Sequence, residues 1–291
     1  MIYRNFGTAG FQVSALGFGA GHIGWDQLDE NFVGSLLNEV VNAGITLIDT
    51  ARGYDLSEER IGRHLSWRRG DFILSTKGGY GVENTPDWTR ENIHRGVDRA
   101  LRTMRTDHLD IFHLHSCPLG TLQDEKLLKA LQEVKTQGKV RAVAYSGENE
   151  ALEWAVQSGV FDSIQCSVNP FDQRSIPLLS TAKDRGMGVI AKRPLGNVPW
   201  TYAERPTGQY AEEYWLRMQA MGYTPPIPWD EFALRFTVFT EGVSSAIVGS
   251  RNLQNILRNI EILEQGPLGS EVYLEMREVF EAHDQEWIGQ V

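Results

Sequence analysis

Eight short apolar runs alternate with amphipathic segments along the whole chain, and this alternation limits the choice of fold more than any other feature. Strands that are apolar throughout are buried on both faces, and helical crossovers make neighbouring strands parallel. Helical periodicity is clear in residues 124–137, where Leu127, Leu128, Leu131 and Val134 share one face. The apolar runs cover residues 15–19, 46–50, 72–77, 109–115, 140–146, 163–168, 188–193 and 245–250.

Two α/β folds are compatible with this alternation. Eight strand–helix units in 291 residues favour a closed (β/α)8 barrel, the TIM barrel, over an open doubly wound sheet. The run GFGAGHIG at residues 17–24 resembles the glycine-rich loop of open dinucleotide-binding sheets. However, Trp25 and Asp26 separate it from a helix that begins near Asp29. We therefore expect the barrel, and the residues at the predicted strand ends support this choice.

Three segments lie outside the repeat. Residues 2–14 are expected to form an N-terminal β-hairpin at the floor of the barrel, with Gly7 and Gly10 near its turn. Residues 195–228 are rich in Pro, Gly, Trp and Tyr and are expected to form a lid loop, because long loops in compact domains often serve function. A C-terminal helix is expected at about 270–287. No linker interrupts residues 1–291, which predicts one domain.

Composition excludes several classes of partner. The formal charge of −10 argues against nucleic acid, because neutralising phosphates requires a basic surface. Cys117 and Cys166 form no C-x-x-C pair, which suits a reducing cytoplasm, and no run approaches the roughly 20 apolar residues of a membrane span. His113 and His115 have no third ligand near by in sequence, so no metal site is expected. We expect a soluble cytoplasmic protein that acts on a small molecule.

Ionisable residues stand at the carboxyl ends of several predicted strands, where a (β/α)8 barrel has its active site. Asp49, Lys77 and His115 end three of the runs, and Tyr54 follows Asp49 by five residues. A nearby ammonium lowers the pKa of a phenol, and a buried ammonium needs a carboxylate partner. This combination suits carbonyl reduction, in which Tyr54 protonates an oxygen that His115 orients. A hydride source is missing, so a cofactor is implied.

These motifs resemble the aldo-keto reductase family. D-T-A-x-x-Y at 49–54, S-E-x-x-I-G at 57–62, T-K at 76–77 and D-I-F-H-L-H at 110–115 follow the order of the family, and the resemblance covers essentially the whole chain. It implies Asp49, Tyr54, Lys77 and His115 as the catalytic tetrad, with Tyr54 as the general acid. It also selects His115 over His113, which strand alternation alone does not separate.

The resemblance further implies a site for NADPH or NADP+, with NADH as the alternative cofactor. Ser250, Arg251 and the backbone N–H groups of the helix that follows suit a 2′-phosphate. Arg193 can stack on the nicotinamide, reach the cofactor phosphates or bind a substrate carboxylate. The implied cofactor-binding residues are Gly19, Ala20, Gly21, Asp49, Ser146, Gln165, Arg193, Pro194, Leu195, Gly249, Ser250, Arg251, Asn255 and Asn259.

The expected function is therefore that of an NADP(H)-dependent oxidoreductase that reduces an aldehyde or ketone, such as a sugar or another hydroxylated carbonyl compound, to the alcohol. One alternative is a cofactor-binding regulatory or redox-sensor subunit with little turnover, since the family includes such proteins. Another is a Schiff-base aldolase barrel that uses Lys192, although this leaves the tetrad without a role. Asp55, next to Tyr54 in sequence, is a candidate for substrate selection.

Overall fold

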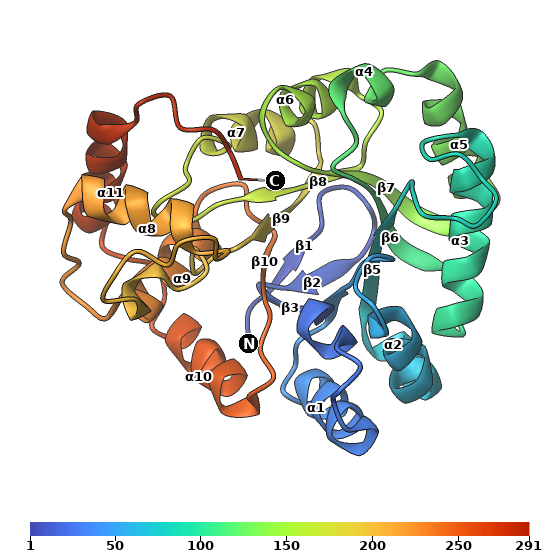
Figure 1. Ribbon diagram of the computed structural model, residues 1–291, viewed down its shortest axis with the longest axis horizontal. Coiled ribbons are helices and arrows are strands. Elements are labelled where there is room, and N and C mark those ends of the chain that lie inside the picture. Colours follow the sequence, from blue (N-terminus) through green and yellow to red (C-terminus); the bar gives the residue numbers. More distant parts are fainter. Residues whose placement is uncertain (291) are drawn as a thin grey trace.

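The computed structural model describes residues 1–290 and contains a closed barrel of eight parallel strands (Figure 1). Closure occurs where the last strand pairs with the first, with Ala246 opposite Leu16. The predicted (β/α)8 fold is confirmed, and the open doubly wound sheet is excluded. The strands are β3 (Leu16–Gly19), β4 (Leu47–Asp49), β5 (Ile73–Gly78), β6 (Leu109–His115), β7 (Val140–Ser146), β8 (Ser163–Ser167), β9 (Gly188–Lys192) and β10 (Ser245–Val248).

The predicted strand boundaries are accurate to one or two residues. Strands β6 and β7 have the predicted bounds, whereas β9 ends before Arg193 and β10 ends before Gly249. Arg193 has a φ of +55°, a left-handed conformation that cannot continue a β-ladder. Arg193 and Ser250 therefore belong to loops at the mouth of the barrel. The directions of their side chains do not follow the in-and-out alternation of a β-strand.

Helices surround the barrel and bury their apolar faces against it (Figure 1). In the predicted segment 124–137, Leu127, Leu131 and Val134 are buried while Leu128 is only partly covered. The last helix ends at His283 rather than near residue 287. The helices are α1 (Glu30–Asn42), α2 (Ser57–Leu65), α3 (Arg90–Met104), α4 (Leu119–Leu122), α5 (Glu125–Thr136), α6 (Asn149–Ser158), α7 (Ile176–Asp184), α8 (Glu212–Met221), α9 (Trp229–Phe239), α10 (Leu253–Glu264) and α11 (Ser270–His283).

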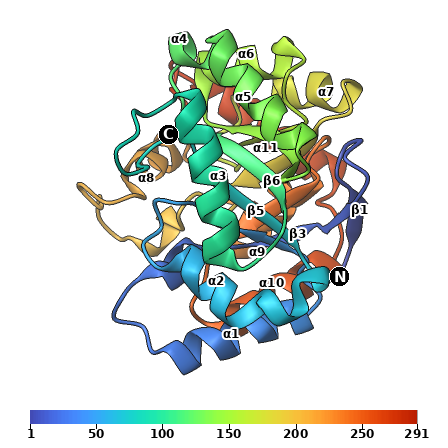
Figure 2. The same ribbon diagram turned by 90° about the vertical axis from the view of Figure 1, so that its right-hand side faces the viewer.

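The N-terminal hairpin closes one end of the barrel. Strands β1 (Tyr3–Asn5) and β2 (Gln12–Ser14) pair antiparallel, as predicted. Phe6, in the connection between them, is fully buried and belongs to a small apolar cluster with the strand residues Leu47, Ile111 and Ile190. In Figure 2 the hairpin lies at one end of the molecule, and α8 lies at the other. The opposite mouth is therefore the one that remains open to ligands.

Residues 195–228 are ordered rather than a structureless loop. They contain a short 3₁₀ helix (Pro199–Thr201) and α8. Three of their aromatic residues, Trp200, Tyr214 and Tyr223, belong to one apolar cluster, and Trp200 stacks on Trp229 with ring centroids 5.8 Å apart. Tyr210 lies outside this cluster, with 75% of its surface exposed at the barrel mouth. In residues 1–290, no helix combines the length and the apolar character needed to cross a membrane.

Candidate active site

A cavity of about 640 Å³ opens at the carboxyl ends of the barrel strands. The predicted residues that line it are Gly19, Gly21, Asp49, Tyr54, His115, Ser146, Gln165, Arg193, Pro194, Leu195 and Gly249. Sequence reasoning did not assign the remaining lining residues to the site, apart from Lys192 in the aldolase alternative. They are His22, Ser116, Lys192, Asn197, Val198, Tyr210, Ile247 and Val248.

Asp49 and Lys77 form a buried ion pair beneath this cavity. Lys77 Nζ donates to Asp49 Oδ2 at 2.5 Å and to the Thr50 carbonyl at 2.8 Å. Burial alone would lower the pKa of Lys77, but the charges of Asp49 and Tyr54 outweigh this effect and raise that pKa above its usual value. The ammonium therefore stays protonated, and Nζ lies 5.2 Å from the centroid of the Tyr54 ring.

Tyr54 reaches this position through a tight loop between β4 and α2. Its backbone N–H donates to the Ala51 carbonyl at 3.0 Å, which closes a turn directly after the strand. The N–H of Arg52 donates to the Lys77 carbonyl at 3.1 Å and ties the same loop to β5. The short spacing between Asp49 and Tyr54 thus brings a carboxylate and a phenol to one ammonium.

A hydrogen-bond network fixes the Asp49 carboxylate. Ser75 Oγ donates to Asp49 Oδ1 at 2.7 Å, and Gln165 Nε2 donates to the same oxygen at 3.0 Å. Ser146 Oγ donates in turn to Gln165 Oε1 at 3.0 Å. The network joins β4, β5, β7 and β8, so two residues predicted to bind the cofactor are connected to the predicted tetrad.

The structure separates the two histidines of β6. His115 lines the cavity, and its ring meets the Tyr54 ring edge to face with centroids 6.0 Å apart. Burial and the positive charges of Lys77 and Lys192 lower the pKa of His115 to about 3, so the ring is neutral. His113 is fully buried, pairs in register with Lys77 and contacts Ser75 Oγ at 3.1 Å. Of the two histidines of β6, only His115 can therefore contact a ligand in the cavity.

Two cations stand at the end of β9. Lys192 Nζ lies 3.1 Å from Glu148 Oε1, and burial lowers the pKa of Lys192 although Glu148 opposes this effect. Arg193 Nη2 donates to Tyr210 Oη at 3.0 Å, and Nη1 donates to Ser167 Oγ and to the Gln290 carbonyl. Arg193 therefore bridges the 195–228 segment and the C-terminal segment. No sequence pattern indicated Glu148 or this bridge.

The residues predicted for the 2′-phosphate lie just beyond the cavity, after Gly249. Ser250 Oγ accepts a hydrogen bond from the Asn252 N–H at 3.0 Å, and the exposed Arg251 guanidinium stacks over Trp25 at 4.4 Å. Arg251 forms no ion pair with a carboxylate of residues 1–290. On α10, Asn255 is exposed and Asn259 is buried. Gly249 lines the cavity and directly precedes Ser250 and Arg251. An extended ligand can therefore reach from the barrel mouth to α10.

Two other predicted residues lie away from the cavity lining. Ala20 is buried in a short 3₁₀ helix, Ala20–Gly24. Asp55 is exposed in a left-handed turn with a φ of +43° and does not line the cavity.

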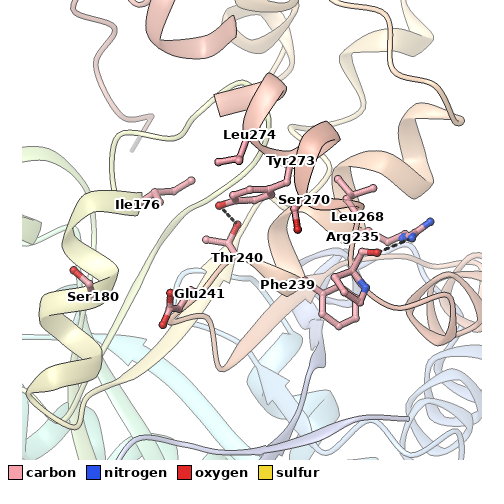
Figure 3. A pocket seen from close by; sticks show the side chains of 11 residues that line it. Ile176, Ser180, Arg235, Phe239, Thr240, Glu241, Leu268, Ser270, Tyr273 and Leu274 are labelled. Carbon is pink, nitrogen blue, oxygen red and sulfur yellow. Dashed lines mark hydrogen bonds between the residues drawn. The ribbon is translucent and has the colours of Figure 1, made fainter. Parts of the chain in front are cut away.

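A second cavity of about 490 Å³ lies outside the barrel, among α7, α9 and α11 (Figure 3). Tyr273 points toward Thr240, and their hydroxyl oxygens are 3.2 Å apart. The charged groups in its lining are paired, Arg235 with Glu231 and Glu241 with Lys183. None of the predicted site residues lines it, so the cavity at the barrel mouth is the candidate active site.

Comparisons with known proteins show the family and the fold of this chain. The model of the family described as "Aldo/keto reductase family" matches residues 15–281. An uncharacterized oxidoreductase of Bacillus subtilis, YqkF, is 27% identical over 90% of both chains. The L-galactose dehydrogenase of Arabidopsis thaliana is 27% identical, over 88% of this chain and 86% of its own. The solved holo structure of aldo-keto reductase AKR11C1 from Bacillus halodurans covers 96% of both chains with a TM-score of 0.84 at 24% identity, a likeness of fold.

Proposed function

The chain belongs to the aldo/keto reductase family of oxidoreductases, and we propose that it reduces an aldehyde or ketone to the alcohol with NADPH. One observation carries this proposal: Asp49, Lys77, Tyr54 and His115 converge at the mouth of the barrel. Reduction of a carbonyl group leaves negative charge on its oxygen, which needs a proton donor and a hydrogen-bond donor. Tyr54 and His115 supply these two groups.

Each residue has a distinct task in the proposed reaction. Tyr54 transfers its hydroxyl proton to the substrate oxygen, and the Lys77 ammonium stabilises the phenolate that remains. Asp49 keeps Lys77 charged, while the neutral His115 orients the carbonyl oxygen. The cofactor, when bound, supplies the hydride for the carbonyl carbon.

The residues of the mouth fit NADP(H). Ser146 and Gln165 offer polar groups suited to a carboxamide next to Asp49. Beyond Gly249, the exposed Arg251 and the first turn of α10 provide donors for a phosphate. These features support a cofactor that extends from the tetrad along the loop between β10 and α10.

For the substrate, we propose a sugar or a similar hydroxylated carbonyl compound. The cavity around the tetrad carries several polar side chains, including Ser116, Lys192 and Asn197, that can bind hydroxyl groups. The name of the plant relative, L-galactose dehydrogenase, is consistent with this class. The Schiff-base alternative has less support, because the ammonium of Lys192 is paired with Glu148.

A steady-state screen tests the proposed function. We expect oxidation of NADPH that depends on a carbonyl substrate, with hydroxylated aldehydes reduced more efficiently than aromatic aldehydes or keto acids. The screen uses both cofactors and both reaction directions. Saturable binding of NADPH without reduction of any carbonyl compound would instead favour a cofactor-binding regulatory subunit.

Arg251→Ala is expected to weaken NADPH binding at least tenfold, because it removes a charge-assisted hydrogen bond to the 2′-phosphate, and such bonds contribute about 1.5–3 kcal/mol. NADH lacks that phosphate and should lose little affinity. Fluorescence titration with each cofactor measures the two effects. Arg258→Ala is the matched control, since Arg258 is paired with Asp230 at 3.0 Å. Equal losses of affinity for NADPH and NADH in Arg251→Ala would show that Arg251 does not bind the 2′-phosphate.

A further inference from the structure

The loop after β5 carries a tyrosine that the proposed reaction does not yet use. Tyr80 Oη lies 2.8 Å from Nδ1 of His115, and the two rings lie 5.8 Å apart at an angle of 31°. Within residues 1–290, Nε2 of His115 has no hydrogen-bond partner, and the ring lines the cavity. One nitrogen of His115 is thus engaged by Tyr80, and the other is available to a ligand.

Tyr80 is held in place from several sides. The Trp88 ring packs against Tyr80 with centroids 5.8 Å apart. It also covers Gly79, where a Cβ would lie 2.3 Å from the indole. The carbonyl of Gly81 accepts a hydrogen bond from Arg52 Nε at 2.9 Å. These contacts fix the loop, so Tyr80 keeps its position against His115.

The loop that carries Tyr54 leaves space for the Tyr80 hydroxyl. A Cβ at Gly53 would lie only 2.9 Å from Tyr80 Oη, so an alanine there would displace one of the two groups. Gly53 directly precedes Tyr54 in the sequence. The same tight turn therefore positions Tyr54, the proposed proton donor, and leaves room for the Tyr80 hydroxyl that contacts His115.

The protonation states around this contact allow Tyr80 to be the donor. Burial and two nearby lysines lower the pKa of His115 to about 3, so its ring carries a single proton. Burial and the neighbouring Tyr54 raise the pKa of Tyr80, so its phenol keeps a proton to donate. When one ring nitrogen of a neutral histidine accepts a hydrogen bond, the proton of the ring resides on the other.

We propose that Tyr80 is a positioning residue whose hydroxyl donates to Nδ1 of His115 and holds that ring in the Nε2–H tautomer. The N–H of Nε2 is then directed at the cavity. The catalytic consequence rests on the proposed function: the substrate's carbonyl oxygen meets a donor. In the opposite tautomer it would meet the lone pair of Nε2, which repels it.

The tautomer can be measured without any substrate, by ¹⁵N NMR of protein labelled at histidine. The His115 signals are those missing from the spectrum of His115→Gln. We expect the proton on Nε2 in the wild type, and in Tyr80→Phe a shifted Nδ1 signal with a larger fraction of the Nδ1–H form. Gly53→Ala, which crowds the hydroxyl, should shift the Nδ1 signal in the same direction. A wild-type proton on Nδ1, or an Nδ1 signal unchanged in Tyr80→Phe, would overturn the proposal.

Turnover provides the second measurement. Tyr80→Phe keeps the ring and its packing, and we expect kcat/KM for the carbonyl substrate to fall about tenfold, the effect of one hydrogen bond. Tyr3→Phe is the control, because its hydroxyl donates to the Gly44 carbonyl at the closed end of the barrel. A kcat/KM of Tyr80→Phe equal to that of the wild type would overturn the positioning role. If the wild type reduces no carbonyl compound, the proposed function fails, and the NMR result still decides the tautomer.

Discussion

Tyr54→Phe is expected to lower kcat by about 10²- to 10⁴-fold, the range that a positioned general acid contributes. The variant keeps the aromatic ring that packs near Lys77 and His115 but lacks the proton for the substrate oxygen. Cofactor affinity should barely change, because the hydroxyl acts on the substrate. Steady-state kinetics with the best carbonyl substrate and a fluorescence titration with NADPH separate the two quantities.

Tyr202→Phe is the matched control for this experiment. Tyr202 lies in the 195–228 segment, and its hydroxyl donates to Gln209 Oε1 at 3.0 Å, away from the cavity lining. Its loss should leave kcat within about twofold of the wild type, as expected for one exposed hydrogen bond. If Tyr54→Phe retained wild-type turnover, Tyr54 would not be the acid, and another group at the mouth would have to supply the proton.

Lys77→Met is expected to impair both turnover and stability. Removal of the ammonium leaves the Tyr54 phenolate without its stabilising charge, and loss of such a group typically costs about 10²- to 10³-fold in kcat. It also leaves the Asp49 carboxylate buried without a counter-charge, which should lower the free energy of unfolding by about 3–5 kcal/mol. Urea unfolding and steady-state kinetics of the same preparations measure both effects.

The double variant Asp49→Asn/Lys77→Met separates the two consequences. An amide at position 49 can still accept hydrogen bonds from Ser75 and Gln165, and it carries no charge that needs a partner. We therefore expect most of the lost stability to return while kcat stays low. Recovery of turnover together with stability would mean that the pair serves only folding.

Much of the fold could be predicted from local pattern. The eight apolar runs correspond to the eight barrel strands because strands covered on both faces must be apolar throughout, and this requirement is visible residue by residue. The predicted tetrad residues converge for a related reason. Parallel strands bring their carboxyl ends to one mouth, so Asp49, Lys77 and His115 come together once their strand ends are recognised.

The sequence alone determined the strand–helix repeat, the family and the residues that end the strands, because each of these depends on local periodicity or on short motifs. Only the tertiary structure decided that the sheet closes through β10 and β3, and that Tyr80 contacts His115. It also decided that Arg193 joins Tyr210 to Gln290. The strand pairing joins the two ends of the sheet, and the contacts of Tyr80 and Arg193 depend on loops with left-handed backbone conformations at Gly79, Gly81 and Arg193. Periodicity carries no information about either.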